Sequence, residues 1–291
     1  VTFIENHDTQ YRSADSPNDP IKNFIQAGNA FILCMPGTPC VFLPHWKSYK
    51  QEIKQLISMR KLAGITNQSG YAERSTAANL YAAEVTGQNG KLIVACGGGS
   101  YSPPADYVLA ITGANYKVYA SKSLETAWAS IASGEFEKAF SVTLSAISAD
   151  ASAKLVYTTD GSEPTASSKS VASGTPVSIS ESCTLKVGLL SGGQVKNIIT
   201  RNYKIVPFVP HTATVYVKDP GWPQMYFYAW ANDANNTQLN GGWPGNAVTD
   251  TKVIGGAKWY YKSFNITSKD YSFNIIFDKG SSNDQTVDIG T

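Results

Sequence analysis

The hydrophobic pattern of the chain changes its period near residue 66, and this change limits the folds that the sequence allows. Before that point, continuous apolar runs at residues 1–4 and 39–43 are each followed by apolar residues at helical spacing, over residues 21–32 and 49–63. After it, short segments with a period of two recur between turn residues to the end of the chain. The pattern predicts a multidomain, mostly β protein that begins with two strand–helix units.

Strand, helix, strand and helix in this order form the repeat of a parallel α/β sheet or barrel. Asp19-Pro20 offers an N-cap followed by proline for the first helix, Pro36-Gly37 stops it, and Gly64 ends the second. Two such units are only a fraction of a closed barrel. We therefore expect residues 1–66 to be a partial (β/α) barrel remnant, consisting of its last two βα units.

Three further domains are expected from the turn signals. Residues 67–120 read as an antiparallel β domain, with hairpin turns at Gln88-Asn89-Gly90 and Gly113-Ala114-Asn115. Residues 121–206 begin with a short helix near 124–133 and continue as short strands typical of a β-sandwich. After a linker marked by Pro207 and Pro210, residues 207–291 form a second β-sandwich.

Composition excludes several classes of function. The net charge is +2 and no basic run occurs, so the electrostatic footprint of a nucleic-acid-binding protein is missing. No apolar stretch reaches the length of a membrane span. The four cysteines, at positions 34, 40, 96 and 183, form no metal-type pair, and the chain has only 3 His. We expect buried free thiols, with a Cys34–Cys40 disulfide as the alternative, and no metal or cofactor.

The segment Glu5-Asn6-His7-Asp8-Thr9 follows the first apolar run and is the first candidate site. Catalytic residues of βα barrels lie at the C-terminal ends of the strands. A carboxylate in that position can stabilise an oxocarbenium-like transition state. The alternative is that Asp8 and His7 only satisfy backbone groups of a loop.

The runs TFIENHDTQYR and AFILCMPGTPCVF resemble barrel strand seven, and helix seven leading into strand eight, of alpha-amylases of glycoside hydrolase family 13. The resemblance extends over about residues 1–120. It implies that Asp8 is the carboxylate that stabilises the transition state and that His7 binds the sugar beside it. Asn6 then shapes the strand end and Glu5 is structural. For His45, a place on the rim after strand eight and a structural role both remain open.

The same resemblance places the nucleophile and the acid/base of the family on earlier barrel strands, before the residue that matches Val1. A retaining glycosidase needs both groups, so we expect this chain alone to be inactive. The family's calcium site also lies upstream. Unpaired edges of the two barrel strands predict self-association, collapse onto the β domain or disorder. The parent is expected to be extracellular, on the cell surface or periplasmic.

Aromatic residues concentrate near the C-terminus, where MYFYAW places Tyr226, Tyr228 and Trp230 on one face of a strand. Phe227 and Ala229 point to the other face, which we expect to be the core. Aromatic rings on a rigid sheet stack on the CH faces of sugar rings. The alternative is burial of both faces, which we assign to Trp259 and Phe273 and leave open for Trp230.

The order YFYAW, GGWPGNAVT, KWYYKSF and NIIFDKGSSNDQT resembles starch-binding modules of family 26 over about residues 212–291. The resemblance implies stacking of Tyr226 or Tyr228 and Trp243 on α-glucan, with Lys279 and Gln285 bonding its hydroxyls. LVYTTDGSEPT, at residues 155–165, resembles a chitobiase-type C-terminal β-sandwich repeat and implies a spacer.

These resemblances together predict the C-terminal portion of an alpha-amylase that hydrolyses α-1,4-glucan with retention. Starch and maltooligosaccharides are its expected partners. Two alternatives are a non-catalytic α-glucan-binding protein and another family 13 enzyme, such as a pullulanase-like or maltogenic amylase.

Overall fold

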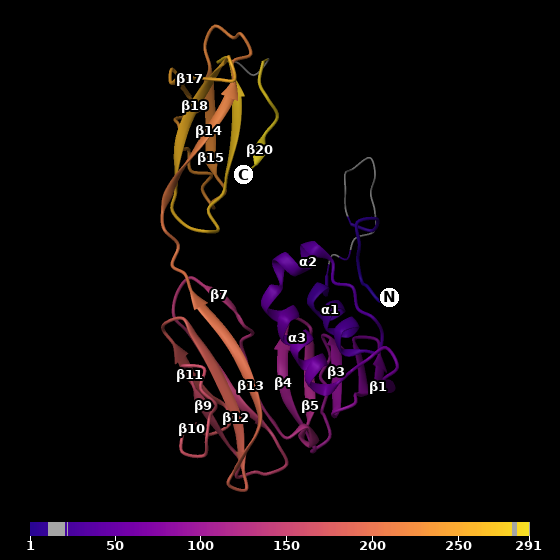
Figure 1. Ribbon diagram of the computed structural model, residues 1–291. Coiled ribbons are helices and arrows are strands. Elements are labelled where there is room, and N and C mark those ends of the chain that lie inside the picture. The colour runs from indigo at the N-terminus through magenta and orange to yellow at the C-terminus, as the bar shows by residue number, and fades with distance from the viewer. Residues whose placement is uncertain (11–20, 22, 281–283, 291) are drawn as a thin grey trace. The chain divides into compact units, whose positions relative to one another are not determined.

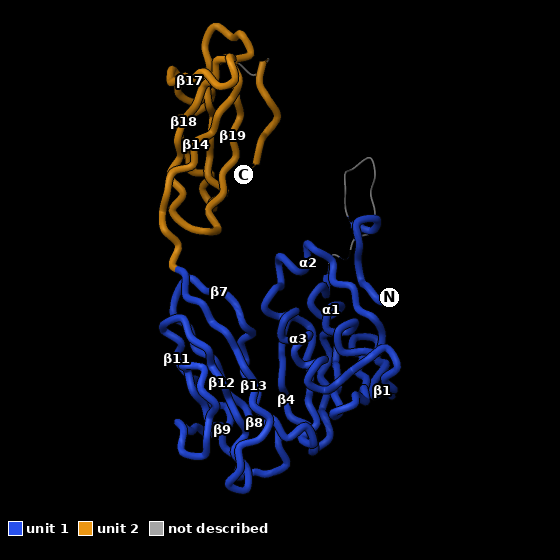
Figure 2. Tube along the Cα trace, in the orientation of Figure 1, with its two compact units in different colours: residues 1–206 blue, residues 207–291 orange. Residues whose placement is uncertain are grey.

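The computed structural model describes residues 1–10, 21, 23–280 and 284–290, and divides the chain into two compact units. Unit 1 comprises Val1–Val206 and unit 2 comprises Pro207–Thr291 (Figure 2). Both are mostly β, as predicted, and their sheets are almost entirely antiparallel. No helix in the described part of the chain is long and apolar enough to cross a membrane.

Three helices open unit 1: α1 (Ile25–Cys34), α2 (Leu43–Ser48) and α3 (Lys50–Ala63). The predicted second helix is confirmed as α3, and Gly64 ends it in the left-handed conformation with φ 71°. The first helix begins later than predicted, because Phe24, its N-cap, has φ 61°. The Asp19-Pro20 cap lies outside the described residues.

The predicted strands at residues 1–4 and 39–43 were wrong. Only a single parallel bridge, between Thr2 and Pro39, joins the two segments. It has two hydrogen bonds, from Thr2 N to Thr38 O (2.9 Å) and from Cys40 N to Thr2 O (2.8 Å). Leu43 already begins α2, with a proline in its first turn, so the second segment continues into a helix soon after this bridge. The partial barrel remnant expected for residues 1–66 is therefore not confirmed, and the described residues contain no barrel.

A five-stranded antiparallel sheet follows in the order β1-β2-β3-β5-β4. Its strands are β1 (Gly70–Ala77), β2 (Leu80–Thr86), β3 (Lys91–Gly97), β4 (Tyr107–Gly113) and β5 (Tyr116–Ser121). Helices α1 and α3 lie against one face of this sheet (Figure 1). Leu56 and Met59 of α3 share a core there with Val94 and Val118.

Arg60 of α3 fastens the end of α1. Its Nη1 donates to Leu33 O (3.0 Å) and Met35 O (2.8 Å), and its Nη2 donates to Gly37 O (2.7 Å). The last carbonyls of a helix have no partners within the helix. Helix α1 ends at Cys34, just before Pro36-Gly37, as predicted, and the guanidinium stabilises the turn that follows.

The rest of unit 1 is a β-sandwich with sheets β10-β9-β12-β13-β7 and β11-β8-β6. Its strands are β6 (Thr126–Ala129), β7 (Gly134–Phe136), β8 (Phe140–Ile147), β9 (Lys154–Thr158), β10 (Lys169–Val171), β11 (Thr175–Ile179), β12 (Cys183–Ser191) and β13 (Gln194–Ile205). Leu144, Leu155 and Leu185 are fully buried between the sheets. The two-sheet core explains the alternating pattern of the sequence.

The predicted helix near residues 124–133 was wrong. A short 3₁₀ turn, Lys122–Leu124, ends at Glu125, whose φ of 45° cannot continue a helix. The following segment pairs with β8 as strand β6. Leu and Ala favour helices in isolation, but pairing and burial in the sandwich override this propensity.

Unit 2 has two facing sheets, in the orders β14-β18-β17 and β16-β15-β19-β20. Its strands are β14 (His211–Lys218), β15 (Tyr226–Ala231), β16 (Asn246–Ala247), β17 (Thr251–Ile254), β18 (Ala257–Ile266), β19 (Phe273–Asp278) and β20 (Ile289–Gly290). Phe273 lies in the core, as predicted. Trp259 does not, because alternation along β18 buries Tyr260 and leaves Trp259 half-buried on the other face.

All four cysteines are free thiols, so the alternative Cys34–Cys40 disulfide is excluded. Burial raises the pKa of Cys34 far above its usual value, and raises that of Cys96 to about 12. These two thiols are therefore protonated at neutral pH and unreactive. Cys40 is exposed and Cys183 is half-buried, so the expectation of buried thiols fails for Cys40.

Candidate functional site

Asn6 organises the turn that carries the first pair of predicted site residues. Its side-chain Oδ1 accepts hydrogen bonds from Asp8 N (2.8 Å) and Thr9 N (3.1 Å). Its own N–H donates to Thr9 Oγ1 at 3.1 Å. This Asx turn holds the backbone in one conformation, with His7 and Asp8 at its tip.

His7 and Asp8 are adjacent and face solvent. The distance from His7 Nε2 to Asp8 Oδ1 is 3.4 Å, and the two side chains are 77% and 69% exposed. An acidic and an imidazole side chain held side by side can bind sugar hydroxyls. The hydrogen bonds of the turn, and not burial of the side chains, restrict the positions of His7 and Asp8.

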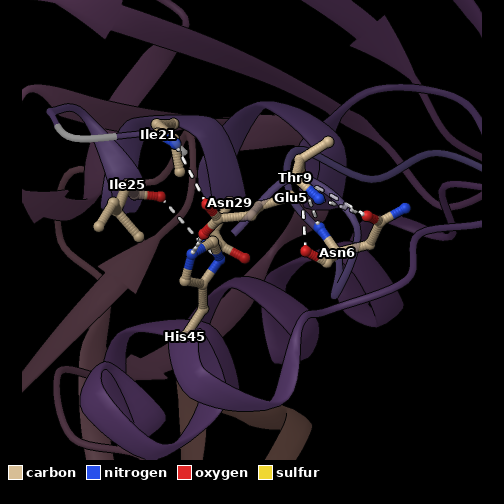
Figure 3. A network of polar contacts seen from close by, with 7 residues as sticks. All are labelled: Glu5, Asn6, Thr9, Ile21, Ile25, Asn29 and His45. Atoms are coloured by element: carbon tan, nitrogen blue, oxygen red, sulfur yellow. Dashed lines mark hydrogen bonds and ion pairs between the residues drawn. The ribbon is translucent and has the colours of Figure 1, made fainter. Parts of the chain in front are cut away.

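A buried polar network lies directly behind the turn (Figure 3). Glu5 Oε2 lies 2.7 Å from Nε2 of His45, and Glu5 Oε1 accepts from Ile21 N at 3.2 Å. Asn29 Nδ2 lies 3.4 Å from His45 Nδ1 and donates to Ile25 O at 2.9 Å. With Asn29 as donor to Nδ1, the imidazole proton is on Nε2 and points to Glu5.

The burial and hydrogen bonds of this network give Glu5 and His45 a structural role. Glu5 and His45 are 7% and 4% exposed, and the polar atoms of both side chains all have partners within the network. Glu5 is therefore not available as a second catalytic carboxylate. Sequence reasoning missed Asn29, although an asparagine on the apolar face of a predicted helix is a signal of a buried polar partner.

The second group of predicted residues lies on β15 in unit 2. Tyr226, Tyr228 and Trp230 are half-buried, while Phe227 and Ala229 are fully buried in the core. The rings of Tyr228 and Trp230 are 5.0 Å apart at 33°. The strand thus presents a continuous aromatic surface on its outer face, and Trp230 belongs to this face instead of the core.

Trp243 adds a second aromatic plane to this surface. Its ring is 5.3 Å from Tyr228 at 80°, and the residue is 44% exposed. The loop that carries it is held by Asn240, whose Nδ2 donates to Phe227 O (2.6 Å) and Asn246 O (3.2 Å). Gly245 has φ 89°, and a Cβ there would lie 2.2 Å from Phe227 O, so only glycine fits.

The loop after β19 brings polar groups to the same edge. Tyr226 is opposite Asp278, and an isolated bridge places Gln285 on the other side of Asp278. Residues directly opposite in a sheet share a face, so Gln285 lies in line with Tyr226. Lys279 forms an ion pair with Asp284, five residues further along the chain.

Asp278 is an unusual member of this edge. It is fully buried, its Oδ1 accepts from Gly280 N at 2.6 Å, and its Oδ2 has no partner among the described residues. Burial raises the pKa of this carboxyl group, and the hydrogen bond from Gly280 opposes that rise. The sequence did not predict this burial, because Asp278 is followed by Lys279 and Gly280, which indicate an exposed turn.

Residues that could hold a metal do not cluster in the structure. Within the described ranges, no three His, Cys, Asp or Glu side chains come together. Among the described residues, the arrangement supports hydrogen bonding at the Asn6 turn, and stacking combined with hydrogen bonding at the aromatic face.

Comparisons with known proteins identify two parts of the chain. Residues 131–200 match the chitobiase/beta-hexosaminidase C-terminal domain, which confirms the resemblance seen at residues 155–165. The chain is 36% identical to probable alpha-amylase 2 of Arabidopsis thaliana over 124 residues, which is 41% of this chain and 29% of that protein.

Two further relatives have related names. The chain is 39% identical over 99 residues to the alpha-amylase type B isozyme of Hordeum vulgare, covering 33% of this chain and 61% of that protein. It is 35% identical over 102 residues to glucan 1,4-alpha-maltotetraohydrolase of Stutzerimonas stutzeri, covering 33% of this chain and 18% of that protein. The chain thus spans less than two thirds of each relative, and over that part it is related to the alpha-amylases.

The first prediction concerns the buried network. His45→Leu leaves the Glu5 carboxyl group buried with one hydrogen bond, from Ile21 N. We expect the free energy of unfolding of unit 1 to fall by about 2–4 kcal/mol, measured by urea denaturation. Lys47→Leu, at an exposed position of the same helix, is the control and should change it little. Equal effects of the two variants would contradict a stabilising role of the network.

The second prediction concerns Asp278. A carboxyl group whose pKa is raised on folding favours the folded state below its unfolded pKa, and this contribution is lost as pH rises through the folded pKa. Asp278→Asn replaces the carboxyl group by an amide that does not ionise, so the variant does not lose this stability as the pH rises. We therefore expect the variant to gain stability relative to the unaltered chain between about pH 3 and pH 7, by on the order of 1 kcal/mol.

Thermal unfolding across this pH range measures the effect of Asp278→Asn. The control is Asp270→Asn, at an exposed position. A relative stability of the Asp278 variant that falls with rising pH would show that the sign is wrong.

Proposed function

We propose that this chain is the C-terminal part of a secreted, starch-degrading alpha-amylase, and that its own function is to bind α-glucan through unit 2. The observation that carries the proposal is the aromatic face of β15, formed by Tyr226, Tyr228 and Trp230, with Trp243 beside it. The relation to alpha-amylases supports the substrate class.

The geometry of the rings suits α-linked glucose. Tyr228 and Trp230 are 33° apart and provide a nearly continuous platform, whereas Trp243 stands at 80° to Tyr228. Successive rings of an α-1,4-glucan are inclined to each other, so a bent aromatic surface contacts more than one of them. Rigid aromatic rings make these contacts at a low cost in side-chain entropy.

Polar groups at the edge of the platform complete the proposed site. Gln285, in line with Tyr226, and Lys279 are assigned to the sugar hydroxyls. Lys279 carries an ion pair with Asp284, which restricts its ammonium group to this loop. The family 26 resemblance assigns the same residues, so the proposal for unit 2 is a starch-binding module of that type.

For unit 1 we propose the role of the end of a catalytic barrel. In the longer protein, Asp8 would stabilise the transition state of a retaining hydrolysis and His7 would bind the sugar. The nucleophile, the acid/base and any calcium site would come from preceding barrel strands. The proposed domains are 1–66 for the barrel end, 67–120 for the antiparallel domain, 121–206 for the spacer and 207–291 for the starch-binding module.

An apolar groove supports the placement of further barrel elements. Phe24 and Phe31 are 52% and 38% exposed and border a groove of about 650 Å³ beside Gly28. Exposed apolar surface of this kind indicates a packing partner. We propose that preceding barrel elements cover it, and that a chain without them self-associates there.

The binding proposal predicts the effect of removing two rings. In the full chain, Tyr228→Ala combined with Trp243→Ala should weaken binding to maltooligosaccharides by roughly tenfold or more, because both stacking planes are lost. Isothermal titration calorimetry measures this. Tyr216→Ala, which removes an exposed tyrosine of the opposite sheet, is the matched control and should bind normally. Unchanged affinity of the double variant would refute the site.

The catalytic proposal is tested separately. Residues 1–291 alone should release no reducing sugar from starch, whereas a longer protein that contains the preceding barrel strands should do so. In that protein, Asp8→Asn should lower kcat by roughly a hundredfold or more. A longer protein that binds starch but hydrolyses nothing would favour the alternative, a non-catalytic α-glucan-binding protein. Activity of the short chain would show that the chemistry is elsewhere.

A further inference from the structure

Asp278, at the end of β19, lies on the side of the sheet that carries the aromatic face, but below its surface. It is opposite Tyr226 in the ladder between β15 and β19, and residues directly opposite in a sheet share a face. Phe277, the preceding residue, packs in the core, so alternation along the strand gives the same result. Asp278 is nevertheless 0% exposed. Its carboxyl group therefore does not contact a sugar on the aromatic face.

The buried carboxyl group of Asp278 makes one short contact. Its Oδ1 accepts from Gly280 N at 2.6 Å, and its Oδ2 has no partner among the described residues. Burial of a carboxyl group costs free energy unless its polar atoms are paired. What Asp278 contributes in return is the position of Gly280, because a hydrogen bond from a backbone N–H to a carboxylate is among the stronger ones.

Gly280 connects this hydrogen bond to the ring of Tyr226. Gly280 has φ 97°, and a Cβ added to it would lie 3.1 Å from Cε2 of Tyr226. The backbone of Gly280 therefore packs against the edge of the ring, which is possible because glycine has no side chain. The carboxyl group of Asp278 thus acts on Tyr226 through a single intervening residue.

Gln285, the other residue in line with Tyr226, is held in a different way. Thr286 N donates to Phe277 O at 2.9 Å, and Phe277 N donates to Thr286 Oγ1 at 3.2 Å. These bonds fix the chain beside Gln285 without the side chain of Asp278. Loss of the Asp278 carboxyl group is therefore expected to affect Tyr226 first.

We propose that Asp278 is a positioning residue of the glucan site: by holding Gly280 against the ring of Tyr226, it fixes the orientation in which Tyr226 meets the sugar. The inference rests on the proposed function of unit 2 and adds a residue that the sugar does not touch. A ring that is fixed before the ligand arrives loses less side-chain entropy on binding.

Two substitutions of Asp278 in the full chain test this role by isothermal titration calorimetry with maltoheptaose, below the unfolding temperature of every variant. Asp278→Leu cannot accept from Gly280 N, so the affinity should fall roughly fivefold. Asp278→Asn retains an oxygen that accepts this bond, so its affinity should stay within about twofold of the unaltered chain. Normal binding by Asp278→Leu, or equal losses in both variants, would overturn the proposal.

A double-mutant cycle separates positioning from a general loss of structure. If Asp278 acts through the ring of Tyr226, Asp278→Leu should cost almost no further affinity in a chain that already carries Tyr226→Ala. Losses that add in the double variant would show that Asp278 supports the site by another route, and would contradict the proposal.

Gly280→Ala tests the contact while leaving Asp278 in place, so it remains informative if Asp278→Leu does not fold. The added methyl group is forced against the Tyr226 ring, and the affinity should again fall roughly fivefold. Gly221→Ala is the matched control: Gly221 has φ 84°, its N–H donates to Asp219 Oδ1 at 2.8 Å, and a Cβ there meets no atom within 4 Å. It carries similar backbone strain and should bind normally. Equal affinities of the two variants would refute the role of the contact.

The outcome for Asp278 is distinguishable from the outcome for the site as a whole. Unchanged affinity of the variant that carries both Tyr228→Ala and Trp243→Ala would refute the glucan site itself. Loss of affinity in that variant, together with normal binding by Asp278→Leu, would refute only the positioning role.

Discussion

Helix α3 holds unit 1 together, because each of its faces is bonded to a different part of the chain. Ile53, Leu56 and Met59 are buried in the core above the five-stranded sheet. Arg60 reaches three carbonyls at the end of α1. On another side, Lys54 donates to Ser133 O, Gln55 donates to Ala129 O and Gln51 Oε1 accepts from Ala132 N (3.2 Å).

These bonds explain why three expected domains form one compact unit. The segment 129–133 enters the sandwich directly from its contact with α3, so the sandwich is attached to the helical layer by side-chain to backbone bonds. Charged and amide side chains bonded to backbone carbonyls contribute more than exposed ion pairs do.

Much of the fold could be predicted from hydrophobic period and turn chemistry. Alternation on β15 correctly separated Tyr228 from Phe227, and Gly64 correctly ended α3, because both depend on local geometry. Residues 1–4 and 39–43 were predicted as strands from their apolar character alone. A strand also needs a ladder of paired residues, and only one bridge, between Thr2 and Pro39, joins these two described segments before Leu43 begins α2. The segment near Thr126 became β6 because long-range pairing with β8 outweighs its helical propensity.

The candidate sites could be predicted only in part, for a related reason. Sequence patterns indicated the rings of β15 and the Asn-His-Asp turn, which depend on neighbours in the chain. They did not indicate that Asn29 and His45 meet beside Glu5, or that Trp259 turns away from the core. Such contacts join segments that are tens of residues apart, and the pattern of one segment carries no information about the other.

The buried contact between Glu5 and His45 has a consequence for how the Asn6 turn is attached to the protein. The Asn6 turn is closed by its own local hydrogen bonds, but Glu5, the residue before it, is joined to a group 40 residues later. A break in the chain between these two segments would leave the hydrogen bonds of the turn in place and weaken the anchor that fixes the turn to the helical layer.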